Sequence, residues 1–165
     1  MSLEINYVDR PEMFKELMPV IKEVWEEAFT PIIGADQVKY MLETYQSETQ
    51  IREEVESGVK YFLLEDNGEI VGYTAYELLE DAVYLSKLYL LKKTRGKGHT
   101  SAIFSWYENL AKEAGKSAVC LRVNQKNQQA IDVYQHKGFV IEKELISDIG
   151  QGYVMDDYWM KKTLA

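Results

Sequence analysis

Cysteine and histidine are scarce in this sequence, which has one cysteine, Cys120, and two histidines, His99 and His136, in 165 residues. A single cysteine excludes an intramolecular disulfide, and the three side chains lack metal-ligand spacing, so we expect no metal site and no redox motif. Because Cys120 lies within the apolar run "SAVCLRV", we expect an inert core side chain there.

Long apolar runs are also missing. No stretch approaches the ~18 apolar residues of a membrane span, and the first residues, "MSLEINYVDR", lack the apolar run of a signal peptide. Acidic residues outnumber basic ones by 27 to 19, a formal net charge of -8, which disfavours nucleic acid and anionic membranes as partners. We therefore expect a soluble, cytoplasmic protein with a cationic partner.

The chain has no repeat, no low-complexity tract and no linker, and its length suffices to bury roughly two thirds of the surface exposed on unfolding. We expect a single domain over residues 1–165. The first third is mostly helical after one short strand at residues 3–7. Asp9 is expected to cap the first helix, Pro19 to bend or split it, and Gly34 to follow its end. Two shorter helices should follow before Gly58.

From Lys60 the apolar period changes to two, which predicts strands. "YFLLEDNGEIVGYTAYELL" predicts a hairpin that turns at Asn67-Gly68, and "AVYLSKLYLL" predicts a third strand. A helix ending at Gly115, the central strand "SAVCLRV", a short helix ending at Gly138 and the final strands "FVIEKELI" and "YVMDDYWMKKTL" complete the chain. This order predicts an α+β fold with a mixed sheet and helices on both faces.

Residues 92–101, "KKTRGKGHTS", form a basic turn between a strand and a helix. The spacing matches neither a Walker A loop nor a dinucleotide-binding fingerprint. Gly96 and Gly98 let the main chain approach an anion, Arg95 and Lys97 add positive charge, and the helix start presents N–H groups. The spacing alone leaves two interpretations open: an anion site, or a solvated turn that binds nothing. We expect His99 to be an exposed loop side chain.

The segment "VNQKNQQAIDVYQHKGF" places Asn127, Ala130, Tyr134 and the pair Gly138-Phe139 at fixed offsets after a central strand. Here the sequence resembles the GNAT family of acyl-CoA-dependent N-acetyltransferases. Its phosphate-binding motif, Arg/Gln-x-x-Gly-x-Gly/Ala, corresponds to Arg95, Gly98 and Thr100, with Thr100 departing from the small residue. The segments "EEAF", "LYLLKK" and "MDDYWMKKTL" look more narrowly like bacterial polyamine acetyltransferases. The resemblance implies a mixed, mostly antiparallel, splayed sheet.

The resemblance also implies acetyl-CoA as co-substrate and a role for each matching residue. The pantetheine arm would pair with the main chain of residues 88–90 and contact Asn127. Tyr134 would stand near the sulfur and protonate the leaving thiolate, because a phenol of pKa about 10 is protonated at neutral pH. Main-chain N–H groups of the central strand would steady the oxyanion formed when a neutral amine attacks. The implied cofactor-binding residues are Leu88, Tyr89, Leu90, Arg95, Gly96, Lys97, Gly98, His99, Thr100, Ser101 and Asn127, with Lys92, Lys93 or Lys97 meeting the remaining phosphate charge.

The general base and the acceptor are not identified by the sequence. Ser86 and Arg122 stand where some relatives place a glutamate, which leaves ordered water or another carboxylate as the base. The implied acceptor is a small-molecule primary amine or polyamine. The alternatives are a protein or peptide amine, and a CoA-binding module without catalysis, while a homodimer is compatible with either. The candidate bases among the carboxylates are Glu26, Glu27, Glu77 and Asp157. The acids that form either an acceptor groove or a plain solvated surface are Glu26, Glu27, Asp36, Glu43, Asp156 and Asp157.

Overall fold

The computed structural model describes residues 3–165, which form seven β-strands, five α-helices and two short 3-10 helices. The strands are β1 (Leu3–Tyr7), β2 (Lys60–Asp66), β3 (Glu69–Leu78), β4 (Ala82–Leu90), β5 (Ala118–Asn124), β6 (Val140–Gly150) and β7 (Tyr153–Thr163). The α-helices are α1 (Phe14–Ile33), α2 (Ala35–Glu43), α3 (Glu48–Glu56), α4 (His99–Glu113) and α5 (Gln128–His136). The 3-10 helices are η1 (Pro11–Met13) and η2 (Lys92–Thr94).

The strands are hydrogen-bonded in the order β1-β2-β3-β4-β5-β7-β6. Strand β4 pairs in parallel with β5, whereas the pairs β1–β2, β2–β3, β5–β7 and β6–β7 are antiparallel. This mixed, mostly antiparallel sheet of seven strands with its five α-helices confirms the predicted fold class. None of the helices in the described part of the chain is long and apolar enough to cross a membrane.

The chain forms two compact units. The first comprises the residues up to Glu77 together with Lys87–Ile103, and the second comprises Leu78–Ser86 together with Phe104–Ala165. Strand β4 and helix α4 each contribute residues to both units. The single domain expected over residues 1–165 stays a prediction.

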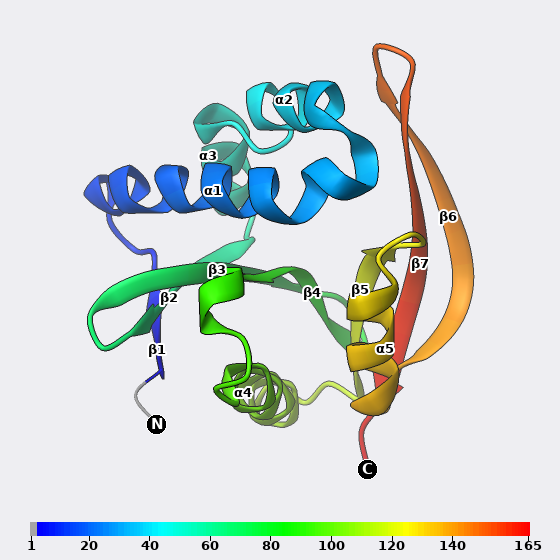
Figure 1. Ribbon diagram of the computed structural model, residues 1–165. Coiled ribbons are helices and arrows are strands. Elements are labelled where there is room, and N and C mark those ends of the chain that lie inside the picture. The colour runs from blue at the N-terminus through cyan, green and yellow to red at the C-terminus, as the bar shows by residue number, and fades with distance from the viewer. Residues whose placement is uncertain (1–2) are drawn as a thin grey trace. The chain divides into compact units, whose positions relative to one another are not determined.

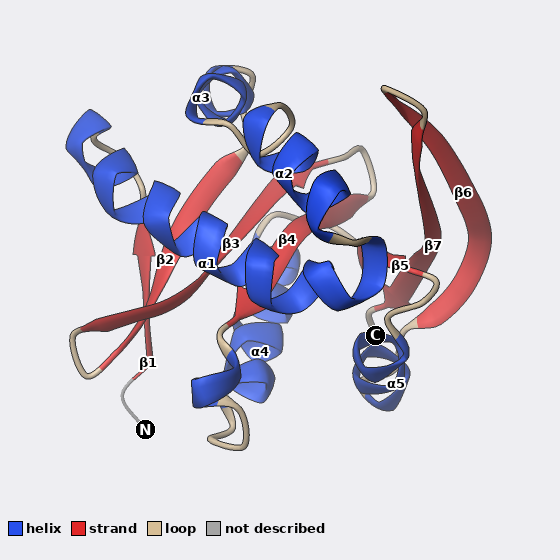
Figure 2. Ribbon diagram, turned by 45° about the horizontal axis from the view of Figure 1, so that its top comes forward, coloured by secondary structure: helices blue, strands red, loops and turns tan. Residues whose placement is uncertain are grey.

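In the first unit, helix α1 lies across one face of strands β2 and β3 (Figures 1 and 2). Its start differs from the expectation, because Arg10 rather than Asp9 is the N-cap residue of η1, and no side chain caps it. Pro19 does not split the helix. The N–H that proline lacks would have bonded the carbonyl of Lys15, and both residues are exposed. Burial of the opposite face outweighs that lost bond, through Phe14, Leu17, Val20, Ile21, Val24, Trp25 and Phe29.

The hairpin expected at Asn67-Gly68 is confirmed. Strand β2 pairs with β3 up to the turn, where Asp66 lies opposite Glu69. Asn67 and Gly68 have φ values of 53° and 82°, the left-handed conformation that a two-residue turn of this hand requires. The hairpin therefore brings two carboxylates, one on each side of the turn, to the end of the first unit's sheet.

In the second unit, β6 and β7 form a long hairpin (Figure 1). Gly150 ends strand β6, and the turn consists of Gln151 and Gly152. Cys120 is 2% exposed and packs with Ala82 and Ala118, as expected for an inert core residue. Burial raises the pKa of its thiol to about 11, so the reactive thiolate is disfavoured at neutral pH.

Candidate functional site

The basic turn connects η2 to helix α4 in the first unit. Gly96 and Gly98 have φ values of 81° and 78°, which glycine adopts without strain, and α4 begins directly afterwards at His99. At Gly96 an added Cβ would meet no atom within 4 Å, so this main chain borders open space. The first intrahelical bond of α4 runs from the Ala102 N–H to the Gly98 carbonyl. The helix thus presents its N-terminal end, with its partial positive charge, at the glycine turn.

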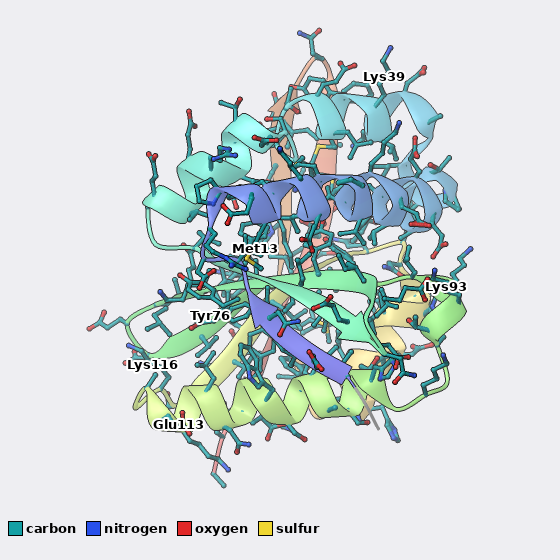
Figure 3. All side chains as sticks on the ribbon, turned by 90° about the vertical axis from the view of Figure 1, so that its left-hand side faces the viewer. Met13, Lys39, Tyr76, Lys93, Glu113 and Lys116 are labelled. Atoms are coloured by element: carbon teal, nitrogen blue, oxygen red, sulfur yellow. The ribbon has the colours of Figure 1, made fainter. Side chains whose placement is uncertain are left out.

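Three carboxylates of the same unit hold the basic turn. A Glu27 oxygen on α1 accepts a hydrogen bond of 2.6 Å from the Lys92 N–H at the start of η2. Lys93, which Figure 3 shows on the segment after β4, pairs with Glu69 at 2.8 Å. The third carboxylate, Asp66, lies 3.5 Å from the Lys97 ammonium. The Lys93 and Lys97 ammonium groups are therefore partly neutralised. The pair between Lys93 and Glu69 is exposed at both ends, so it is weak enough for a polyanion to compete with it.

His99 is not the exposed loop side chain that the sequence suggested. As the first residue of α4 it turns inward and is only 3% exposed, and its Nε2 lies 3.1 Å from the Asp66 Oδ2. Its Nδ1 is buried and has no hydrogen-bond partner among residues 3–165. The burial of His99 cannot be predicted from its neighbours in the chain, because a single residue in a glycine-containing turn is not part of a periodic apolar pattern.

The main chain of β4 next to the basic turn offers two sets of polar groups. The Lys87 carbonyl accepts from the Thr74 hydroxyl and the Leu91 N–H donates to the Val71 carbonyl, so both face strand β3. By strand alternation, the N–H and C=O groups of Leu88 and Leu90 face the opposite edge. These two residues therefore offer the main-chain groups suited to pairing with an extended ligand.

Tyr89 anchors this part of β4 to helix α1. Its ring packs edge-on against Phe29 and Trp25, with centroids 5.5 and 6.1 Å away, and lies 5.4 Å from the ring of Tyr73. The Tyr73 hydroxyl accepts a hydrogen bond of 2.9 Å from the Trp25 indole. Tyr73 and Tyr76 are 0% and 6% exposed, so they pack in the interior and do not line an open groove.

In the second unit, Asn127 is the N-cap of helix α5. Its side-chain oxygen accepts from the Ala130 N–H at 3.3 Å, and its own N–H donates to the Asn124 carbonyl. An asparagine cap uses the carbonyl oxygen of the amide, so the side-chain NH₂ group is still a donor for another partner. The structure therefore gives Asn127 a local structural role that is compatible with the ligand contact implied by the sequence.

Tyr134 lies on α5 in an aromatic setting. Its ring packs edge-on against Phe104, with centroids 5.8 Å apart, and lies 6.1 Å from the ring of Phe139. Burial raises the pKa of Tyr134 to about 12, because the ionised phenolate would be poorly solvated. Within residues 3–165 the hydroxyl forms no hydrogen bond, and it is not fully buried. The Tyr134 hydroxyl therefore stays protonated at neutral pH and can donate a hydrogen bond.

Two of the four candidate bases are engaged elsewhere. Glu27 accepts the Lys92 N–H, as described above. Asp157 on β7 is 6% exposed and pairs with Arg122 on β5 at 3.0 Å, while Arg122 also donates to the Ser147 hydroxyl. Burial raises the pKa of Asp157, and Arg122 only partly opposes this shift. Its carboxylate serves as the counterion of Arg122.

A buried charge pair was missed in the sequence. Lys87 on β4 pairs with Glu54 on α3 at 3.0 Å, and the same Glu54 oxygen accepts from the Tyr61 hydroxyl at 2.8 Å. Burial lowers the pKa of Lys87 and Glu54 opposes this shift. The one available signal was a lysine inside the apolar run "AVYLSKLYLL", since a lysine buried in a strand needs a partner.

Comparisons with known proteins agree on one family. The acetyltransferase (GNAT) family matches residues 18–139 of the chain. An uncharacterized N-acetyltransferase of Mycobacterium tuberculosis is 30% identical over 152 residues, which cover 91% of this chain and 97% of that protein. The PaiA N-acetyltransferase of Thermoplasma acidophilum, solved in complex with coenzyme A, has a TM-score of 0.80 at 19% identity and covers 99% of both chains. A GCN5-related N-acetyltransferase from Rhodopseudomonas palustris has a TM-score of 0.79 at 14% identity and covers 99% of this chain and 97% of its own.

Proposed function

Since the chain belongs to the GNAT acetyltransferase family, we propose that it transfers the acetyl group of acetyl-CoA to a primary amine of a small cationic molecule, with polyamines as the acceptor class. The protein is an acyl-CoA-dependent N-acetyltransferase with acetyl-CoA as its co-substrate. A CoA-binding module without catalysis, one alternative from the sequence, does not fit a family of transferases. The acceptor class and the residue roles that follow are parts of the proposal.

The basic turn fits the anionic end of acetyl-CoA. Gly96 and Gly98 have left-handed φ values that expose the main chain, and α4 begins at the next residue with its positive end. Arg95 and Lys97 are exposed beside the glycines. These groups would hold the diphosphate, and the outward-facing main-chain groups of Leu88 and Leu90 would hold the extended pantetheine arm.

Acetyl-CoA supplies the thioester, whose thiol product is a better leaving group than any amide nitrogen. Tyr134 would donate a hydrogen bond to the sulfur as negative charge develops there. With a pKa of about 12, its phenol is a weaker acid than an ordinary thiol by about three to four pKa units, so it stays protonated until that charge appears. Asn127 would donate through its amide NH₂ to a carbonyl of the arm.

The acidic surface of helices α1 and α2 supports the proposal that the acceptor is a polyamine. Glu23 and Glu26 on α1 and Asp36 and Glu43 on α2 are all exposed, and the two helices pack together. Lys39, which extends outward from α2 in Figure 3, offsets part of this charge, and α1 carries two exposed lysines, Lys15 and Lys22. Glu27 and Asp157, grouped with these acids from the sequence, are engaged by Lys92 and Arg122. The remaining carboxylates would hold the distal charges of a multiply protonated amine.

A paired acetylation assay tests the proposal. The purified protein is incubated with acetyl-CoA and either spermidine, a monoamine of similar length, or peptides with a free N-terminus and a lysine, and the products are identified by mass spectrometry. We expect kcat/KM for spermidine to exceed that for the monoamine by about tenfold or more at low salt, with the advantage shrinking as salt increases. Equal rates for the two amines, or activity confined to peptides, would overturn the polyamine proposal.

A charge variant links the result to the helices. Changing Asp36 to Asn and Glu43 to Gln together should reduce the preference for spermidine over the monoamine and leave the monoamine rate unchanged, because only the distal charges lose their partners. The control is Glu48→Gln on α3, which removes an exposed carboxylate whose partner is Arg52, four residues along the helix. The control should keep the full preference.

A further inference from the structure

Beneath the basic turn, one carboxylate reaches both neighbours of Gly98. The Asp66 Oδ2 lies 3.5 Å from the Lys97 ammonium and 3.1 Å from the His99 Nε2. We propose that Asp66 and His99 are positioning residues that hold the start of α4 in the conformation that receives the cofactor's diphosphate. This inference rests on the proposed function of the basic turn, and neither residue needs to touch the cofactor.

The chemistry of the pair sets the direction of its hydrogen bond. An ionised carboxylate is acceptor-only, so the His99 Nε2 must carry the proton that it donates to Asp66. The His99 side chain is 2% exposed and that of Asp66 is 10% exposed, so water competes little with this bond. The bond therefore fixes the imidazole ring inside the first unit, and with it the first residue of α4.

Fixing both flanks of Gly98 matters because glycine is the most flexible residue. Gly96 and Gly98 have left-handed φ values of 81° and 78°, one of several conformations open to a glycine. With only exposed neighbours, the turn would sample many conformations, and binding an anion would have to select one of them. Anchoring the residues on either side of Gly98 removes that freedom beforehand, which strengthens binding by preorganisation.

Asp66 is well placed to act as the fixed point. It is the last residue of β2, opposite Leu3 on one side and Glu69 on the other, and directly precedes the Asn67-Gly68 turn. Two neighbouring strands therefore hold its main chain. Among residues 3–165 the carboxylate of Glu69, across the same turn, has one ion-pair partner, Lys93, whose side chain is 52% exposed. The two hairpin carboxylates thus differ in what they anchor.

The pair Asp66→Asn and Glu69→Gln separates positioning from simple charge. Each substitution removes one negative charge from the same hairpin beside a polyanion site, so electrostatics alone predicts equal or tighter acetyl-CoA binding in both. A positioning role predicts weaker acetyl-CoA binding for Asp66→Asn alone, because the amide cannot form an ion pair with Lys97 and holds His99 less strongly. Measured by calorimetric titration with acetyl-CoA, Asp66→Asn should weaken binding by about fivefold or more, while Glu69→Gln should not weaken it.

Three variants of His99 provide the second arm. His99→Gln can place an N–H where Nε2 lies, His99→Asn is too short to do so, and His99→Leu has no donor. We expect affinity for acetyl-CoA to fall by about tenfold in the Leu and Asn variants and to recover to within about threefold of wild type in the Gln variant. Melting temperatures are measured for each, since a purely structural role would lower them without this recovery pattern in affinity.

The outcomes separate the two proposals. No binding of acetyl-CoA to the wild-type protein would remove the proposed role of the basic turn. Binding to wild type with unchanged affinity in Asp66→Asn, or equal losses in His99→Gln and His99→Leu, would overturn the positioning role alone. If His99→Leu does not fold, the hairpin pair Asp66→Asn and Glu69→Gln still decides the question, because both substitutions lie at the surface end of the hairpin and keep side-chain size.

Discussion

The ring of Phe104 packs edge-on against the ring of Tyr134, with their centroids 5.8 Å apart. The contact uses the ring and leaves the hydroxyl free for chemistry. Tyr134→Phe should therefore keep the fold and remove only the proton donor. We expect turnover to fall by roughly 10²-fold or more, with affinity for acetyl-CoA changed little, because general-acid contributions are of that order. Steady-state kinetics and calorimetry on one preparation measure both, and unchanged turnover would make Tyr134 a packing residue.

Gly72 on β3 determines how closely this strand approaches β4, whose Leu88 and Leu90 main-chain groups are proposed to hold the pantetheine arm. A Cβ at this position would overlap the Tyr89 carbonyl oxygen and lie 3.1 Å from the Leu90 Cα. Gly72→Ala must therefore push the main chain of β4 away, and we expect a loss of about 1–3 kcal/mol in stability together with weaker acetyl-CoA binding. Gly115→Ala is the control, since it is strained by its φ of 71° but meets no atom within 4 Å. It should lose stability and keep its affinity.

Periodicity predicted most of the fold. Helix α1 buries residues at helical spacing, strands β2 and β5 each bury a run of four consecutive residues, and Asn67-Gly68 marks its hairpin turn by conformational preference alone. The predictions for the first helix were wrong where tertiary packing outweighed a local sequence preference. Asp9 is a good capping residue, yet Arg10 is the N-cap of η1, and Pro19 is tolerated because α1 buries a continuous apolar face.

Only part of the candidate site could be identified from the sequence. The glycines, Asn127 and Tyr134 are recognisable because their spacing along the chain is fixed. The carboxylates that organise the turn are not, because each reaches it from a distant segment. Asp66 is 33 residues from His99, and Glu27 is 65 residues from Lys92. Such pairs depend on which strand ends meet, which a single sequence does not reveal.

Buried phenols should make the protein sensitive to alkali. Burial raises the pKa values of Tyr61, Tyr73 and Tyr134, the last to about 12. A group whose pKa is higher in the folded state stabilises the fold below its unfolded pKa, about 10 for tyrosine, and this contribution is lost as the pH rises through the folded value. Stability against urea should therefore be constant up to about pH 9 and decline above about pH 10.

Tyr134→Phe again provides the matched comparison for this pH dependence. Removing the Tyr134 phenol should reduce the alkaline loss by up to about 2.7 kcal/mol, the amount that corresponds to a pKa raised from 10.0 to about 12. Tyrosinate absorbance recorded during the titration should rise together with unfolding. Absorbance that rises for all tyrosines well below the unfolding transition would contradict the burial argument.

The two compact units should unfold together. Strand β4 and helix α4 each contribute residues to both units, so unfolding either one removes part of a strand and part of a helix from the other. We expect one cooperative transition, with tryptophan fluorescence and far-ultraviolet circular dichroism coinciding in urea. Trp25 reports on the first unit, and Trp106 and Trp159 report on the second. Two separated transitions would replace the single domain predicted from the sequence by two.

Gly98 gives the most direct test of where the diphosphate binds. Its φ of 78° strains most side chains, but Asn and Asp tolerate this conformation and have nearly the same shape. Gly98→Asn and Gly98→Asp therefore share any backbone strain and differ by one negative charge.

A ligand that binds only the folded state stabilises it by about 2.7 kcal/mol at a hundredfold excess over Kd, which a melting curve detects. We expect acetyl-CoA to raise the Tm of wild type and, to a smaller extent, of Gly98→Asn, and to leave that of Gly98→Asp unchanged, because a carboxylate beside the diphosphate repels it. If acetyl-CoA raises the Tm of both variants as much as that of wild type, the diphosphate binds away from Gly98. If it raises the Tm of neither variant, the cofactor requires the glycine backbone, and the local charge is not the cause.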